Sequence, residues 1–387
     1  MRRTRARMGS HTHNSGRRVL LRLLAVLGGT LLAIALAEAA LRLGLGGTPH
    51  LLTKRSLRPR GQPLVMYHCY DSNPNGEMAP APDTGQGAWE LFQLTLPPTP
   101  LPVARLRETP FCVRYDRVQT ASGRRLRGPA PSVEPPAGVR RILGLGDSFA
   151  YGEGVPQHRT LFAQMEALLG PAYEILNGAR PGDDTHAEVA ALLDLGRQFH
   201  ADRALVVFIA NDIQLSESLR QRQSRIYDLI NIRDKLLQDE QAKAWPAGRL
   251  QLAQLLGTRL ALWRTGRSTI QWYLDSYDPR HNSENLAALA QDLAALAQMP
   301  GMRTVLVLYP LLEGLEGRYP LQPIHDRVAA MARAAGLPVL DLAPAFAGMR
   351  TSSLWVHPTD HHPNGKAHAV AARAIVDWLR RQVPGFL

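Results

Sequence analysis

The sequence predicts an α/β domain whose parallel β-sheet is covered by helices on both faces. From Arg140 onward, short apolar runs alternate with longer amphipathic stretches. This alternation is typical of βαβ units, whose strands run parallel and are buried. The apolar runs predict five strands, at 142–145, 173–176, 204–210, 304–309 and 338–342. Five such strands between two helical layers would make a flavodoxin-like three-layer sandwich.

The helices between these strands are predicted from their amphipathic periodicity. We expect them at 160–169, 185–199, 283–298 and 325–335, with a last helix near 364–382. Residues 213–280 are too long for a simple connection and carry helical periodicity over 250–262, so they predict a helical insertion. The main domain is therefore expected to span 139–387.

The preceding residues, 46–138, predict a small accessory segment and a linker. They are rich in Pro and Gly, with strand candidates at 89–96 and 111–118. The only two cysteines of the chain, Cys69 and Cys112, lie here. They are a candidate disulfide in an oxidising compartment, and two unpaired thiols are the alternative.

The N-terminus has the pattern of a membrane topology signal. A basic stretch, 1–18, precedes an apolar run, 19–45, that is interrupted by Arg22, Glu38 and Arg42. We expect a single-pass transmembrane signal anchor at 19–45, with the basic end in the cytoplasm. The main domain would then lie on the extracytoplasmic, periplasmic side of the inner membrane. The alternatives are a cleaved signal peptide with secretion, and a soluble amphipathic helix.

The overall charge does not indicate a nucleic-acid-binding protein. The formal net charge of +12 raises that possibility. However, seven arginines lie in the first 22 residues, and without them 38 basic residues stand against 33 acidic ones. The excess is largely a property of the N-terminus, so no nucleic-acid partner is expected. The sequence contains no CxxC pair and no zinc-ligand spacing, so no cofactor or metal is expected either.

Ser148 is the candidate nucleophile. The strand predicted at 142–145 runs directly into Gly146-Asp147-Ser148. A serine at this point lies at the carboxyl edge of the sheet, where open α/β folds place their active sites. Its backbone N–H would then be free to stabilise an oxyanion. The alternative is a serine that only caps the following helix.

Two further strand ends offer oxyanion donors. Gly182 precedes the helix predicted at 185–199, and helix N-termini direct backbone N–H groups outward. Asn211 and Asp212 follow the strand predicted at 204–210, and the Asn211 amide can donate a hydrogen bond. The alternatives are an ordinary loop at Gly182 and an Asx turn at Asn211. We expect Asp212 to be structural.

The candidate base and acid precede the last predicted helix. His362 follows Asp360 by two residues, and a carboxylate on the same side of a loop can orient an imidazole that deprotonates a serine. The neighbouring His357 and His361 either line the site or are solvated. Three histidines and an aspartate could also ligate a metal, but no distant carboxylate partner is evident in the sequence.

In their order along the chain, these motifs resemble those of the SGNH/GDSL hydrolase family over about residues 139–383. The Gly-Asp-Ser tripeptide ending at Ser148 is similar to the nucleophile block of that family. Gly182, Asn211 and His362 match its glycine, asparagine and histidine blocks. The resemblance implies the SGNH hydrolase fold and an oxyanion hole formed by the Ser148 and Gly182 amides and the Asn211 side chain.

The sequence departs from the family pattern in two places. Ile209 stands where the asparagine block usually has glycine, and Thr359 stands where the acid is usual, three residues before the histidine. Asp360 is the only carboxylate nearby, so the role of the acid in a Ser-His-Asp triad is carried over to it. A Ser-His dyad with a structural Asp360 is the alternative. The layout of residues 1–138 resembles a membrane-anchored bacterial subgroup.

The sequence therefore predicts a serine esterase or acyl hydrolase that needs no cofactor. Its substrate would be an acylated small molecule, lipid or glycan. If a sugar hydroxyl replaced water as the acceptor, the same site would make an O-acyltransferase acting on a cell-envelope or exported polysaccharide. A non-catalytic envelope binding module, using the insertion at 213–280, is the remaining alternative.

Overall fold

A computed structural model describes most of the chain, in two compact units. One unit comprises Met1–Leu51 and Tyr227–Gly266, and the other comprises Leu52–Ile226 and Arg267–Leu387. The described residues are 12–42, 55–59, 61–70, 72–80, 89–93, 96–101, 111–226, 252, 266–358 and 360–387. Much of the insertion predicted at 213–280, including nearly all of the helical stretch at 250–262, lies outside them.

The first unit contains α1 (Thr12–Arg42), which covers most of the predicted membrane anchor. Within the described part of the chain, no helix combines the length and the apolarity needed to cross a membrane. The transmembrane anchor predicted at 19–45 is therefore not supported. Glu38 of this helix is buried and accepts a hydrogen bond from the backbone N–H of Leu252, at 2.9 Å.

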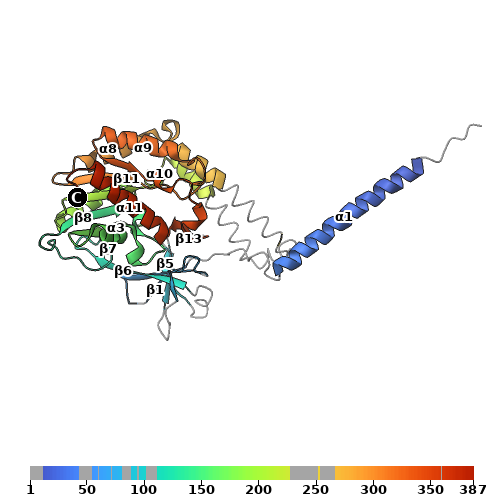
Figure 1. Ribbon diagram of the computed structural model, residues 1–387, viewed down its shortest axis with the longest axis horizontal. Helices are drawn as coiled ribbons and strands as arrows, with labels where there is room; N and C mark the ends of the chain where they lie inside the picture. The colour runs from blue at the N-terminus through green and yellow to red at the C-terminus, as the bar shows by residue number, and fades with distance from the viewer. Residues whose placement is uncertain are drawn as a thin grey trace, which may run out of the picture. The chain divides into compact units, whose positions relative to one another are not determined.

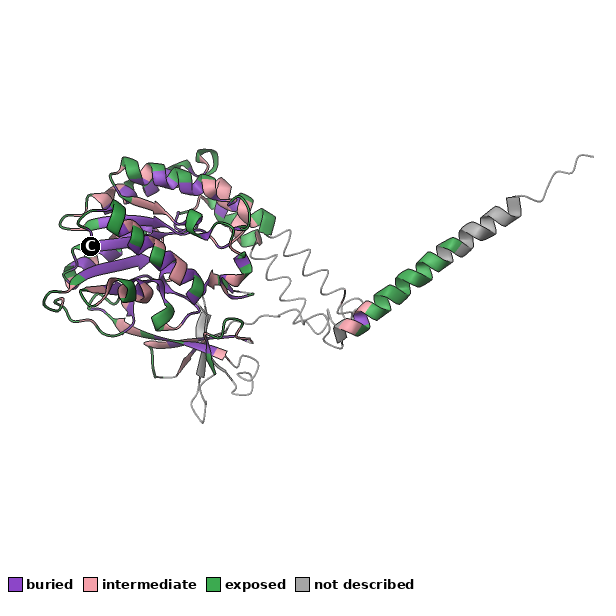
Figure 2. Cartoon of the chain, viewed as in Figure 1, coloured by how far each residue is buried: buried purple, intermediate pink, exposed green. Residues whose placement is uncertain are grey.

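The second unit contains the predicted strands as a parallel core. They are β8 (Arg140–Gly146), β9 (Tyr173–Asn177), β10 (Arg203–Phe208), β11 (Arg303–Leu308) and β12 (Val339–Asp341), in the order β12-β11-β10-β8-β9. After their first residues, β8, β10 and β11 are buried throughout, which Figure 2 shows in purple. Strands buried on both faces are typical of a sheet between two helical layers.

The helices form two packed groups (Figure 1). α3 (Leu161–Leu169) packs against α11 (Gly365–Gln382), and α8 (Pro279–Ala297) packs against α4 (Thr185–Gln198) and α9 (Gln322–Ala334). α9 begins three residues before the predicted position and has a proline in its first turn, where the missing N–H costs nothing. α8 begins at Pro279, but Asn282 within it has a non-helical backbone, and the helix after this kink starts at the predicted residue 283. Shorter helical elements are α2 (Ser148–Tyr151), α10 (Ala343–Phe346), η2 (Gln157–Arg159) and η4 (Thr351–Ser353).

The prediction of a sheet with only five parallel strands is wrong. The five parallel strands belong to a larger, mixed sheet that also contains antiparallel strands. The edge of β9 that faces away from β8 pairs antiparallel with β7, at Arg127 and Asn177. The backbone groups along this edge of β9 therefore gain hydrogen-bond partners. Counting the described residues, this sheet has 12 strands. The additional ones are β1 (Arg55–Pro59), β2 (Val65–Tyr70), β3 (Ala79–Pro80), β4 (Trp89–Gln93), β5 (Leu96–Leu101), β6 (Phe111–Gln119) and β7 (Arg125–Arg127). A separate antiparallel ribbon consists of β13 (Trp355–His357) and β14 (Asp360–Pro363).

A disulfide joins two of the antiparallel strands. Cys69 of β2 and Cys112 of β6 are directly opposite each other in the strand register. Both side chains are buried, and their sulfur atoms are bonded across a sequence separation of 43 residues. The bond fixes β2 against β6, and through β6 and β7 these strands are connected to the parallel core.

Removing this disulfide should destabilise the protein. The reduced chain regains the conformational freedom of a loop of this length, so a Cys69→Ala/Cys112→Ala variant should lose about 2–4 kcal/mol of unfolding free energy. Urea denaturation of the oxidised protein and the double variant measures this loss. Equal midpoints and slopes for the two proteins would show that the bond adds no stability.

Candidate active site

Ser148 stands on a sharp turn between β8 and α2. Gly146 at the end of β8 has φ of +141°, and a Cβ there would lie 2.8 Å from the Val207 carbonyl oxygen, so only glycine fits. Asp147 then caps α2, because its Oδ1 accepts a hydrogen bond from the Phe149 N–H at 2.9 Å. The turn places Ser148 at the carboxyl edge of the sheet, as the first residue of α2.

His362 and Asp360 reach Ser148 from the ribbon of β13 and β14. The Nε2 atom of His362 lies 2.9 Å from Ser148 Oγ, although the two residues are 214 positions apart. On its other side, Nδ1 of His362 hydrogen-bonds Asp360 Oδ1. Alternate residues of an extended strand point the same way, so the spacing of two residues in β14 suits this contact. The structure thus brings the three predicted residues into one hydrogen-bonded chain.

The register of three strands places the proposed oxyanion donors along the same edge. The loop after β9 follows the end of β8, since the Arg180 N–H donates to the Gly146 carbonyl oxygen at 3.0 Å. Gly182 follows two residues later, exposed, with φ of +85°. From the other side of β8, Asn211 follows β10, and its Nδ2 donates to Asp147 Oδ2 at 3.1 Å. Asp147 thereby links the turn that carries Ser148 to Asn211.

Buried carboxyl groups lie beneath this edge. Asp147, Glu188 and Asp212 are almost fully buried. Burial, and secondarily the charge of Asp147, raises the pKa of both Glu188 and Asp212 well above the ordinary carboxyl range. Asp212 Oδ2 accepts a hydrogen bond from the Ile209 N–H at 2.7 Å. Within the described chain, Asp212 Oδ1 and both Glu188 oxygens have no hydrogen-bond partner. Asp212 thus binds the backbone of the turn that follows β10.

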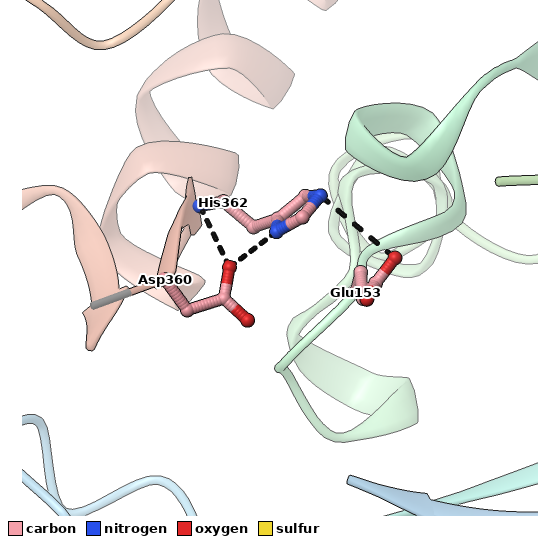
Figure 3. Close-up of side chains that lie close together, drawn as sticks. All are labelled: Glu153, Asp360 and His362. Carbon is pink, nitrogen blue, oxygen red and sulfur yellow. Dashed lines mark hydrogen bonds and ion pairs between the residues drawn. The ribbon is translucent and has the colours of Figure 1, made fainter. Parts of the chain in front are cut away.

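Glu153 is a member of the site that the sequence did not reveal. Its carboxylate lies 3.8 Å from His362 Nε2 (Figure 3). It also lies 3.4 Å from His68 Nδ1. It is buried and belongs to the turn after α2, where no motif distinguishes a structural glutamate from a functional one. Its charge faces the imidazole edge that Ser148 also contacts.

The same acidic and histidine side chains have the spacing of a metal site. Among the described residues, Glu153, Asp360 and His362 offer ligand atoms within 4.8 Å of one another. Both imidazole nitrogens of His362 are already engaged, by Asp360 and by Ser148. A metal would have to displace one of these contacts, so we assign Asp360 and His362 to the hydrogen-bonded chain with Ser148 and treat Glu153 as its neighbour.

The other two histidines of the motif do not contact Ser148 in any described interaction. His361 is exposed, stacks on Trp355 at a centroid distance of 3.7 Å and pairs with Glu313. His357 is buried, and its Nε2 lies 2.7 Å from Ser72 Oγ. His361 is thus an exposed residue of β14 rather than of a loop, and His357 contacts the accessory segment through Ser72.

Tyr70 of β2 also reaches the site. Its hydroxyl donates to Asp360 Oδ2 at 2.8 Å across 290 residues of sequence. Burial, and then the charge of Asp360, raises the pKa of Tyr70 well above its ordinary value, so the hydroxyl keeps its proton. The only sequence signal is the run Val65-Met-Tyr-His-Cys-Tyr70, which as a strand directs His68 and Tyr70 to one face.

Comparison with known proteins gives one family match and several distant structural likenesses. The model of the GDSL-like lipase/acylhydrolase family matches residues 145–370. No curated protein matches the chain.

Among solved structures, a member of the lipolytic G-D-S-L family from Veillonella parvula is 12% identical, with a TM-score of 0.35, over 63% of this chain and 100% of that chain. A carbohydrate acetylesterase from Sinorhizobium meliloti is also 12% identical, with a TM-score of 0.35, over 62% and 98%. A two-domain esterase active on acetylated mannans is 14% identical, with a TM-score of 0.36, over 63% and 50%.

The buried acids predict a pH-dependent effect of Glu188→Gln. Because the pKa of Glu188 is raised on folding, the folded protein holds a proton that the unfolded chain releases above its ordinary pKa of about 4.3. Stability therefore falls as pH rises from that value toward the raised pKa. Glutamine removes this penalty, so the gain in unfolding free energy of the variant over the native chain should be larger at pH 8 than at pH 4.

Denaturant unfolding at both pH values measures the effect of Glu188→Gln. Glu284→Gln is the matched control, because Glu284 is exposed on α8 and its environment changes little on unfolding. The control should change the stability equally at both pH values. An equal change for Glu188→Gln would contradict the assignment.

Proposed function

The chain belongs to the GDSL-like lipase/acylhydrolase family and is a hydrolase of ester bonds, and we propose that it works as a serine esterase with Ser148 as its nucleophile. The observation that carries this proposal is the hydrogen-bonded chain from Ser148 Oγ through His362 to Asp360. A serine, an imidazole and a carboxylate in this order are the parts of a Ser-His-Asp triad.

In the proposed acylation step, His362 Nε2 takes the proton of Ser148 as Oγ attacks the carbonyl carbon of the ester. The oxygen of the tetrahedral intermediate is stabilised by the N–H groups of Ser148 and Gly182 and by the Asn211 amide. Asp360 stabilises the imidazolium through Nδ1. When the intermediate collapses, the ester C–O bond breaks and His362 passes its proton to the leaving alcohol, which leaves an acyl-serine.

The deacylation step repeats this chemistry with water. His362 takes a proton from the water as the water oxygen attacks the acyl carbon. When the bond between this carbon and Ser148 Oγ breaks, His362 returns a proton to Oγ and the carboxylic acid leaves. About 23% of the His362 side chain is exposed, and Asn211 and Gly182 are exposed as well. This openness supports water as the acceptor and an acylated small molecule, lipid or glycan that approaches from solvent.

We further propose that this reaction takes place outside the cytoplasm. Support comes from the disulfide between Cys69 and Cys112, because disulfides persist in oxidising compartments and are rare in reducing ones. The basic stretch at 1–18 followed by an apolar run is also the pattern of export signals. Fractionation of cells that express the full chain, with a thiol-labelling assay on each fraction, tests this location.

Fluorophosphonate labelling tests the nucleophile and the base. The probe should form a covalent adduct with the native chain but not with Ser148→Ala, and His362→Ala should slow labelling by a factor of about 1,000. His361→Ala is the matched control, because this exposed neighbour contacts Trp355 and Glu313 instead. Labelling that persists in Ser148→Ala would place the nucleophile elsewhere.

Product analysis tests water as the acceptor. With an acetylated sugar as substrate, free acetate should appear in equal amount to the deacetylated sugar, and excess oligosaccharide should not reduce its yield. Both products are measured by chromatography. Acyl groups found on the added oligosaccharide, with a matching deficit of free acetate, would show an O-acyltransferase.

A further inference from the structure

The accessory β-strands contribute a side chain to the hydrogen-bonded chain of the site. Asp360 is engaged at both oxygens, because Oδ1 faces His362 Nδ1 and Oδ2 accepts the hydrogen bond of the Tyr70 hydroxyl. Tyr70 is fully buried, and Asp360 is only 5% exposed. The carboxylate therefore has a donor on either side and little access to water, which fixes its rotation about the Cβ–Cγ bond.

The residues that follow Tyr70 fasten the same ribbon at several further points. Ser72 contacts His357, and the Asn75 side chain donates to the carbonyl oxygens of Trp355 and Val356. Beyond the ribbon, the Gly365 N–H donates to the Glu77 carboxylate at 2.9 Å. These contacts reach the three residues of β13 and the first residue of α11, on either side of β14. The position of the ribbon that carries His362 thus depends on residues 70–77.

The disulfide lies next to Tyr70 in β2. Strand alternation directs Cys69 to the face opposite Tyr70, where it bonds to Cys112 of β6. β6 also contributes Tyr115, whose hydroxyl lies 3.1 Å from His68 Nδ1. His68 in turn lies beside Glu153. The two cross-linked strands therefore support both carboxylates that flank His362.

We propose that Tyr70 is a positioning residue for the Ser148–His362–Asp360 chain, supplied by the accessory strands and acting through Asp360. This inference rests on the proposed esterase function. Without the Tyr70 hydroxyl, Oδ2 of Asp360 would be a buried acceptor with one donor fewer, and the carboxylate could rotate away from Nδ1. The imidazole would then be oriented correctly for a smaller fraction of the time.

Kinetics of Tyr70→Phe test this proposal. The variant should show a kcat lowered by about tenfold, with little change in KM, because a hydrogen bond to a charged acceptor is lost. The rate of fluorophosphonate labelling should fall by the same factor. Tyr67→Phe is the matched control, since it removes a hydroxyl from the opposite face of β2. The control should retain the native kcat.

A double-mutant cycle separates positioning from a general structural effect. In an Asp360→Asn background, Tyr70→Phe should cause little additional loss, because its partner is already altered. A native kcat for Tyr70→Phe, or an equal loss in both backgrounds, would overturn the proposal. Thermal unfolding of each variant shows that the proteins compared are folded.

A proton NMR measurement keeps this test independent of the esterase activity. The Nδ1–H proton between His362 and Asp360 should give a low-field signal that is absent in His362→Ala and shifted or broadened in Tyr70→Phe but not in Tyr67→Phe. If the native chain neither hydrolyses esters nor reacts with the probe, the proposed function fails and this signal still decides the role of Tyr70. An unchanged signal in Tyr70→Phe would overturn it.

Discussion

The contact between Ser148 Oγ and His362 Nε2 is the interaction on which the rest of the site depends. It joins the first strand-to-helix turn of the parallel core to a ribbon just before the last helix, 214 residues later. A proton can pass between these atoms only at hydrogen-bond distance. The remaining structure can be understood as two supports that hold the serine and the histidine at that distance.

The serine is held by the parallel sheet. β8 lies between β9 and β10, so its carboxyl end is fixed by backbone hydrogen bonds on both sides. Gly146 and Asp147 then turn the chain, and Asn211 and the loop before Gly182 are aligned by the same register. The buried acids beneath this edge cost stability, because each carries an incompletely satisfied or charged group into the interior. Asp147 offsets part of that cost by accepting hydrogen bonds from the Phe149 N–H and the Asn211 amide.

The histidine is held largely by the antiparallel strands that extend the sheet. Their contacts to the ribbon come from β2 and the residues that follow it, and β2 is cross-linked to β6. In this arrangement the accessory segment is continuous with the parallel core through β7 and β9. Residues 52–226 and 267–387 accordingly form one compact unit, in which the accessory strands share the active site and are more than a spacer.

The sequence by itself determined the βαβ alternation, the five core strands and the nomination of Ser148, His362, Asp360, Gly182 and Asn211. The strands follow from apolar periodicity. The site residues follow from motifs at strand ends taken together with their order along the chain, which resembles that of the SGNH/GDSL family. Only the tertiary structure decided the mixed sheet and the contacts of Glu153 and Tyr70 with the site, and it did not support the membrane anchor at 19–45. Antiparallel pairing of β7 with β9 and a hydrogen bond across 290 residues leave no periodic trace in the chain, because they depend on which segments meet after folding.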